Sequence, residues 1–213
     1  MTLLGNALRP SHPRRPTDES GTVPGVELPP AVAAAQARAE RLGFELSSEP
    51  EVGRLLAFFA SRVPKGGRML ELGTGAGVGL AWIVHGIGDR HDVEVVSVEI
   101  DGEQAAHTRA AGWPGWVSIL EGDGADLVGT LGSFDLIFPD APGGKIFKLR
   151  KTIAALRPGG VILVDDMDLS RHSDPDLRSG LASVRERLFE HPDLVCAELP
   201  FASGVILASR RSP

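Results

Sequence analysis

The sequence predicts an α/β fold built on one mostly parallel sheet of seven strands that ends in an antiparallel hairpin, with helices on both faces. From Arg68 onward, short apolar runs alternate with helical segments, which is the pattern of a parallel sheet with crossover helices. The last two apolar runs, about 194–199 and 204–209, are joined by too few residues for a crossover helix, so they pair antiparallel. The five earlier strands are expected near 68–72, 93–99, 116–121, 134–139 and 161–165.

Length and composition indicate one folded domain with an N-terminal extension. The 213 residues are 42% hydrophobic, enough to bury a full core in one α/β unit. Residues 1–28 are rich in proline and show no hydrophobic period, so we expect a flexible arm there. Residues 29–213 form the predicted domain, with N-terminal helices over 29–64 and a core over 65–213.

Charge and hydropathy argue against a nucleic-acid-binding protein and against a membrane protein. The formal net charge is −6 with acids and bases interspersed, which gives no electrostatic footprint for nucleic acid or an anionic membrane. A small-molecule substrate is therefore the simpler expectation. No stretch approaches the ~20 apolar residues of a membrane span, and the N-terminus lacks an apolar core long enough for a signal peptide. The single cysteine, Cys196, cannot form an internal disulfide, so we expect a cytoplasmic protein.

Two helices are predicted before the first strand. The first spans about 30–42, an alanine-rich segment opened by proline and ended by Gly43. The second follows Ser48 and Glu51, which together form a predicted capping box, and it ends before Pro64.

The segment Met69–Ile83 is the most informative in the chain, because an apolar strand leads through glycines at alternate positions into an apolar helix. Such glycines let a ligand approach the backbone, and the free N–H groups at the helix start would face it. The spacing departs from the G-x-G-x-x-G of dinucleotide-binding proteins. Glu71 adds a carboxylate that suits an amino group or a sulfonium, and S-adenosylmethionine (SAM) carries both. The loop glycines are Gly73, Gly75, Gly77 and Gly79.

A second carboxylate, Glu99, ends the next buried strand, about one βαβ unit downstream of the glycines. An acid at this position can accept hydrogen bonds from both hydroxyls of a ribose. Asp101, two residues later, is interpreted as the cap of the following helix.

Three further acids close two successive strands: Asp140 ends FDLIFPD, while Asp165 and Asp166 end VILVDD. Ligands of open α/β sheets bind beyond the carboxyl ends of strands, and adjacent strands would bring these acids to one edge. Hard oxygen ligands suit Mg²⁺ or Ca²⁺ and offer nothing soft enough to select zinc. The alternative is that Asp140 makes an Asx-turn and that Asp165 or Asp166 caps the next segment of the chain.

The segments after these acids carry two more predicted helices. One spans about 145–156, with Lys145 either solvated at its start or close enough to the acids to act as a general base if its pKa is lowered. His172 is expected on a loop surface. The other helix opens at Asp174, followed by proline at the first helical position, and runs to about Glu190.

Taken together, residues of about 40–209 resemble the metal-dependent, catechol O-methyltransferase-like group of SAM-dependent methyltransferases, which includes the caffeoyl-CoA O-methyltransferases. The resemblance implies a Rossmann-like class I methyltransferase fold. It also implies methyl transfer from SAM to a hydroxyl of a small, catechol-like acceptor with a divalent metal, Mg²⁺ first and Ca²⁺ or Mn²⁺ as alternatives. Members are commonly homodimers. The motifs that carry the resemblance are SSEPEVGRLL, LELGTGAGVG, VVSVEID, LEGDGADL, FDLIFPDA and LRPGGVILVDD.

The resemblance also implies residue roles. The positions that match the methionine end and backbone cradle of SAM are Glu71, Gly73, Gly75 and Gly79. Glu99 matches the acid that binds the ribose. The loop beside the adenine is matched by Gly122, Asp123 and Gly124, and the segment that closes over the cofactor by Leu46 and Ser48. The metal triad is matched by Asp140, Asp165 and Asp166. Asp140 and Lys145 are the candidate catalytic residues, and Lys145 is the lysine nearest to the family's catalytic position.

Two departures from the family pattern stand out. The third metal position is usually Asn, whereas here it is Asp166. The family lysine lies three residues after the first metal acid, where this chain has Gly143, and Lys145 lies two residues further on. Alternatives are therefore a metal-independent small-molecule methyltransferase, a SAM-binding protein without catalysis and an NAD-dependent oxidoreductase. A nucleic-acid methyltransferase should show Asn/Asp-Pro-Pro-aromatic after the fourth strand, where this chain has Asp140-Ala-Pro-Gly.

Overall fold

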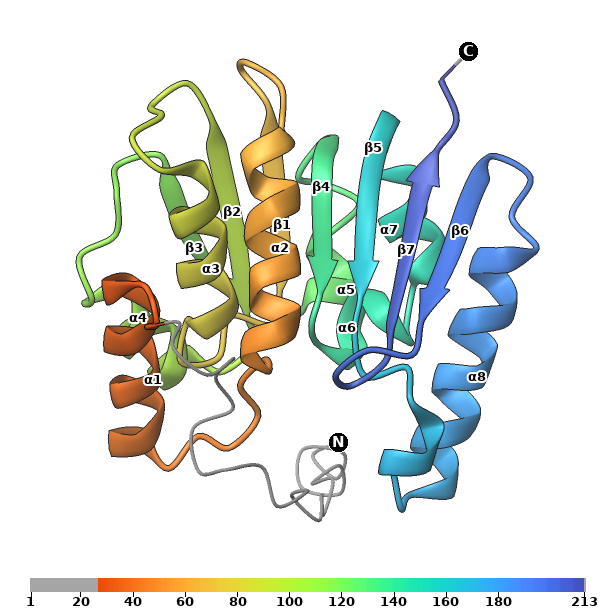
Figure 1. Cartoon of the computed structure of the whole chain (residues 1–213), viewed down its shortest axis with the longest axis horizontal. Helices are drawn as coiled ribbons and strands as arrows, with labels where there is room; N and C mark the ends of the chain where they lie inside the picture. The colour runs from red at the N-terminus through yellow and green to blue at the C-terminus, as the bar shows by residue number, and fades with distance from the viewer. Residues whose placement is uncertain (1–26, 213) are drawn as a thin grey trace.

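The computed structural model describes residues 27–212, so the predicted arm over 1–28 lies almost wholly outside the described residues. The strands form one sheet in the order β3-β2-β1-β4-β5-β7-β6 (Figure 1). Strand β7 runs antiparallel to β5 and β6, and the other pairs are parallel, which confirms the predicted fold class. The strand bounds are β1 Arg68–Leu72, β2 Glu94–Glu99, β3 Val117–Glu121, β4 Phe134–Pro139, β5 Leu156–Val164, β6 Leu194–Leu199 and β7 Val205–Arg210.

Helices cover both faces of this sheet and bury one apolar cluster on each side (Figure 1). In β1, Met69 belongs to the first cluster and Leu70 to the second, so the strand is apolar throughout rather than alternating. Helices α1 to α4 pack on the first face, and α5, α7 and α8 pack on the second. The helix bounds are α1 Pro30–Leu42, α2 Pro50–Arg62, α3 Val78–Ile87, α4 Gly102–Arg109, α5 Gly124–Leu127, α6 Pro142–Lys145, α7 Leu149–Ala154, η1 Leu169–Arg171 and α8 Pro175–Phe189.

Local signals placed the first and last helices correctly. Helix α1 ends at Gly43, whose φ of 62° lies in the left-handed region that glycine adopts without strain. Helix α8 begins after Asp174, whose side chain accepts a hydrogen bond from the backbone N–H of Asp176. Both predictions are confirmed.

The predicted capping box of the second helix is wrong. Helix α2 is capped at Glu49 without a side-chain hydrogen bond, and Pro50 occupies its first turn. Proline has no N–H to be capped there and its fixed φ already suits the helix start. Ser48 instead donates to the Oδ2 atom of Asp140 at 3.2 Å, across 92 positions of sequence.

The single helix predicted over 145–156 is also wrong. The chain forms two short helices, α6 and α7, because Lys148 adopts a left-handed conformation with φ of 65° between them. Gly144 is left-handed as well, with φ of 95°, and a Cβ there would lie 2.2 Å from the side chain of Leu72. Strand β5 then starts at Leu156, earlier than the predicted 161.

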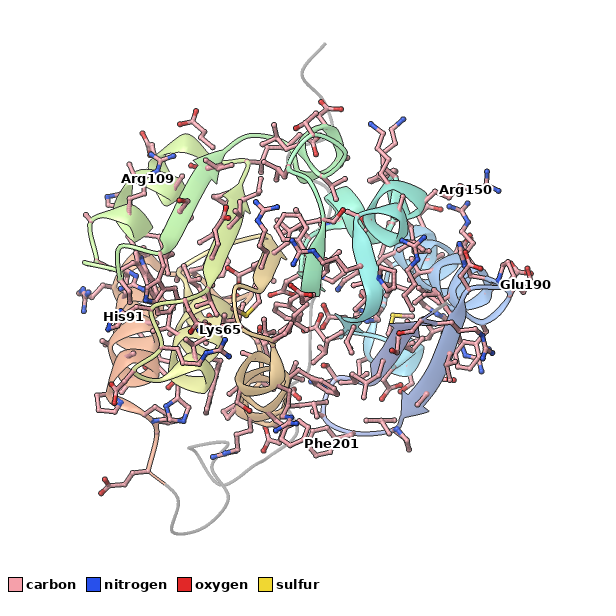
Figure 2. The ribbon with its side chains drawn as sticks, turned by 90° about the horizontal axis from the view of Figure 1, so that it is seen from above. Lys65, His91, Arg109, Arg150, Glu190 and Phe201 are labelled. Atoms are coloured by element: carbon pink, nitrogen blue, oxygen red, sulfur yellow. The ribbon has the colours of Figure 1, made fainter. Side chains whose placement is uncertain are left out.

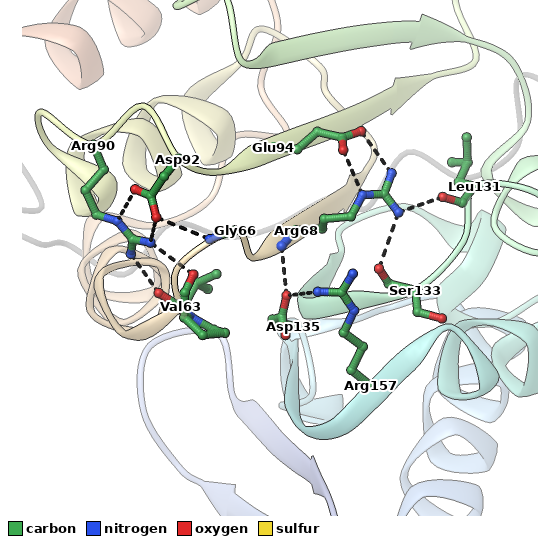
Figure 3. A network of polar contacts seen from close by, with 11 residues as sticks. Val63, Gly66, Arg68, Arg90, Asp92, Glu94, Leu131, Ser133, Asp135 and Arg157 are labelled. Carbon is green, nitrogen blue, oxygen red and sulfur yellow. Dashed lines mark hydrogen bonds and ion pairs between the residues drawn. The ribbon is translucent and has the colours of Figure 1, made fainter.

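The amino ends of the strands are closed by ion pairs (Figure 3). The guanidinium of Arg68 pairs with Glu94 at 2.8 Å, and the backbone N–H of Arg68 donates to Asp135. Arg157 pairs with Asp135 at 2.7 Å. The charges of these side chains at the amino ends therefore neutralise one another. At the opposite end of the sheet, the acids outnumber the cationic side chains beside them.

Arg109, Arg150 and Glu190 lie at the periphery of the molecule (Figure 2). Among the described residues, no helix combines the length and apolar character needed to cross a membrane.

Candidate active site

Three acids meet where β4 and β5 end, at the lower edge of the sheet in Figure 1. Asp140 follows β4, and Asp165 and Asp166 follow β5. One carboxylate oxygen from each lies within 4.8 Å of the others. Because the two strands are neighbours, their parallel pairing brings the acids together as the sequence predicted. The oxygen donors suit a hard divalent cation.

Lys145 lies inside this acid cluster and is only 4% exposed, so of its two predicted positions the one close to the acids is confirmed and the solvated one is wrong. Its ammonium donates to Oδ1 of Asp165 at 3.1 Å and to Oδ2 of Asp166 at 3.2 Å. Burial alone would lower the pKa of Lys145, but the nearby carboxylates outweigh burial and raise it. This is opposite to the lowered pKa that a general base requires, so Lys145 is protonated in the metal-free cluster.

The cluster nevertheless carries more negative charge than one lysine balances. Burial, then the charge of Asp166, raises the pKa of Asp165 to about 6. Burial, then the charge of Asp165, raises the pKa of Asp140 well above its ordinary value. Carboxyl groups whose pKa is raised in this way do not all ionise unless a further cation lies close to them.

The glycine loop after β1 is shaped by contacts within the protein. Gly75 has φ of 49°, and a Cβ there would lie 2.5 Å from the ring of Phe44. At Gly79, a Cβ would lie 2.4 Å from Oε1 of Glu71. At both positions a larger side chain would collide with a neighbouring residue of the protein. These glycines are therefore required for packing within the protein as well as for the approach of a ligand.

Glu71 lies fully buried beneath the glycine loop. Its Oε2 accepts a hydrogen bond from the hydroxyl of Ser97 at 2.5 Å, whereas its Oε1 has no partner among the described residues. Burial raises the pKa of Glu71 to about 8, and the charge of Glu99 adds to the shift. An N–H or cationic group beside Oε1 would satisfy it.

Glu99 is buried at the end of β2, with both oxygens oriented by backbone donors. Oε2 accepts from the N–H of Gly75 at 2.7 Å, and Oε1 accepts from the N–H of Asp101 at 3.0 Å. Each oxygen keeps further acceptor capacity. Asp101 also accepts from Gln104 and caps α4, as predicted.

Ile100 was missed by the sequence reasoning. It follows Glu99 directly and is 70% exposed, the most exposed large apolar side chain among the described residues. An apolar residue just after an acid that ends a strand is a signal that sequence reasoning could have used.

The third loop of this edge follows β3. The N–H of Gly122 donates to the carbonyl of Glu99 at 2.8 Å, which holds this loop beside the end of β2. Asp123 caps α5 by accepting from Ala125 at 2.8 Å. Gly124 lies against the loop after β4, because a Cβ there would be 2.9 Å from the carbonyl of Gly143. The loops after β1 to β4 thus form one continuous rim.

A cavity of about 190 Å³ opens over the acid cluster. Leu46 and Ser48 line it beside Asp140, so the structure places both over the acids. Glu49 closes one side through an ion pair with Arg171. The apolar residues that line this cavity are Leu46, Ala141, Pro142, Ile146, Leu177 and Leu181.

His172 also lines this cavity, and its predicted place on a loop surface is wrong. The side chain is buried, and its Nε2 lies 2.8 Å from the carbonyl of Asp166. No pattern around His172 or Arg171 signals this position, because the turn of η1 brings both back to the cavity.

Comparisons with known proteins agree with this geometry. A family profile described as a methyltransferase domain matches residues 70–167, from β1 to the acid pair after β5. A relative from Mycolicibacterium vanbaalenii, provisionally named an O-methyltransferase, is 32% identical over 192 residues, covering 84% of this chain and 83% of the relative. The chain belongs to the O-methyltransferase family.

Solved structures support the family at the level of the fold. The cofactor-bound Rv0187 protein from MTB is 27% identical with a TM-score of 0.76, covering 91% of this chain and 94% of that one. The SAH-bound methyltransferase PaMTH1 of Podospora anserina is 26% identical with a TM-score of 0.73, covering 87% and 89%. Membership of the O-methyltransferase family removes the oxidoreductase alternative.

Proposed function

We propose that this chain transfers a methyl group from SAM to one hydroxyl of a small, catechol-like acceptor, with a divalent metal, most simply Mg²⁺, at the acid cluster. The observation that carries the proposal is the cluster of Asp140, Asp165 and Asp166, which lines a partly apolar cavity of about 190 Å³. Two adjacent hydroxyls and three carboxylates together offer the oxygen-rich surroundings that Mg²⁺ prefers.

SAM binding is supported by the rim of loops beside this cavity. Glu99 has acceptor capacity for the ribose hydroxyls, and Ile100 offers an exposed apolar surface for the adenine. Oε1 of Glu71 remains to be satisfied beneath the glycine loop, where the amino group of SAM would be expected. The Rv0187 and PaMTH1 structures fit this assignment, since the first is cofactor-bound and the second SAH-bound.

The reaction would be an in-line displacement in which the acceptor oxygen forms a bond to the methyl carbon as the bond from sulfur breaks. The hydroxyl proton passes to solvent, and S-adenosylhomocysteine leaves. A cation held by the three acids would supply a Lewis acid that lowers the pKa of the acceptor hydroxyl. Lys145 adds a fixed positive charge that stabilises the attacking oxygen, and the apolar walls exclude water. Positioning supplies much of the remaining rate.

The test is methyl transfer from labelled SAM to catechols and to matched monophenols, first with Mg²⁺, then with EDTA, then with Mg²⁺ restored. Asp165→Asn removes one charge of the cluster, and Asp176→Asn, on the exposed start of α8, is the matched control. We expect transfer to catechols alone, lost with EDTA and in Asp165→Asn but retained in Asp176→Asn. Transfer that survives EDTA would instead support a metal-independent methyltransferase. SAM binding without transfer to any acceptor would support a SAM-binding protein without catalysis.

A further inference from the structure

Asp166 adopts a backbone conformation that ordinary residues rarely occupy. Its φ is 60°, in the left-handed region, which glycine adopts without strain and which asparagine and aspartate adopt only occasionally. The chain therefore holds this conformation through contacts elsewhere.

The left-handed turn has a direct consequence for the acid pair. In an extended strand, consecutive side chains point to opposite faces, so Asp165 and Asp166 would diverge. Here both reach the same ammonium, that of Lys145, at 3.1 and 3.2 Å. The turn at Asp166 thus brings the third carboxylate to the cluster.

The buried side chain of His172 forms a hydrogen bond to the backbone of this turn. Nε2 of His172 lies 2.8 Å from the carbonyl oxygen of Asp166, and since a carbonyl can only accept, Nε2 carries the hydrogen and donates. His172 is only 6% exposed. On the other side, the backbone of Met167 and Asp168 donates to Gly204 and Ser203, in the loop between β6 and β7.

We infer that His172 is a positioning residue for the metal site: its hydrogen bond holds Asp166 in the left-handed conformation that aims the carboxylate at the cation. The inference rests on the proposed function, because it concerns the same three acids. His172 acts through the backbone of Asp166 rather than as a ligand. Groups that orient ligands in this way commonly affect metal affinity 10- to 100-fold.

The test measures Mn²⁺ affinity by the electron paramagnetic resonance signal of free Mn²⁺, which needs no turnover. His172→Met removes the donor at similar volume, whereas His172→Gln retains an N–H near the position of Nε2. His107→Met, on the exposed surface of α4, is the matched control. We expect a tenfold or greater rise in the Mn²⁺ dissociation constant for His172→Met, recovery to within threefold for His172→Gln, and no change for His107→Met. SAM affinity, measured by calorimetry, should stay within twofold throughout.

A second background separates positioning from general packing. After glycine, asparagine is the residue most used at left-handed positions, so in Asp166→Asn the penalty of His172→Met should fall to threefold or less. The inference is overturned if His172→Met binds Mn²⁺ like the wild type, if His172→Gln is as weak as His172→Met, or if the penalty is unchanged in Asp166→Asn. Absence of Mn²⁺ binding in the wild type would overturn both this inference and the proposed metal, whereas the other three outcomes leave the proposed function intact.

Discussion

Glu71 should make the stability of the fold depend on pH, and replacing it with glutamine should remove that dependence. The carboxyl is fully buried and its pKa is raised to about 8, against about 4.5 for an ordinary glutamate. Between these values the folded state holds a proton that the unfolded chain releases. Since the folded state then binds more protons, the free energy of unfolding falls as pH rises from about 4.5 to 8.

The size of the effect follows from the shift. One pKa unit corresponds to about 1.4 kcal/mol, and full burial leaves no solvent to screen the group. Between pH 5.5 and 7.5, nearly the whole slope applies, so Glu71 should lower the stability of the wild type by about 2 to 3 kcal/mol. In Glu71→Gln this contribution is absent, and the hydroxyl of Ser97 still finds an oxygen to donate to.

Urea denaturation of both proteins at pH 5.5, 6.5 and 7.5, without SAM, measures the difference. Glu103→Gln, on the exposed first turn of α4, is the matched control because it removes a solvated carboxylate. We expect Glu71→Gln to gain stability relative to the wild type as pH rises, and Glu103→Gln to follow the wild type. Parallel curves for Glu71→Gln and the wild type would refute the assignment of a raised pKa to Glu71.

Three further substitutions test the geometry of the site. In the presence of EDTA, Lys145→Met leaves the buried carboxylates without a cation, so it should cost about 3 kcal/mol in urea denaturation, with a greater loss above the pKa of Asp165, about 6, than below it; an equal loss at pH 5 and 8 would contradict this. Gly79→Ala places a Cβ 2.4 Å from Oε1 of Glu71 and should destabilise by about 1–3 kcal/mol, whereas unchanged stability would show that the buried carboxyl moves freely. Glu49→Gln breaks a partly exposed ion pair with Arg171, so stability should change by less than about 1 kcal/mol while the KM for the acceptor rises; an unchanged KM would show that the pair does not shape the cavity.

Much of the fold could be predicted because the signals are local. Apolar runs at strand length, prolines at helix starts and the left-handed Gly43 each act within a few residues, and the structure confirms them. The positions of Asp140, Asp165 and Asp166 were also predictable, since parallel pairing of β4 and β5 brings the ends of both strands to one edge.

Errors arose where local signals competed with distant contacts. Ser48 had the spacing of a cap, but Pro50 already starts α2, and the hydroxyl bonds Asp140 instead. Helical composition after Lys145 concealed the left-handed Lys148, which divides the segment into two short helices.

The sequence by itself determined the element types, the sheet and the set of acids at its edge, because side-chain periodicity and capping depend on neighbours along the chain. Tertiary structure alone decided which cationic side chain lies beside those acids and in which direction their carboxylates point. The left-handed turns at Gly144 and Asp166 bring Lys145 and the third carboxylate together, and the return of η1 brings His172 beneath them. These placements follow from backbone conformations that are stabilised only by contacts between distant segments, and no local pattern encodes them.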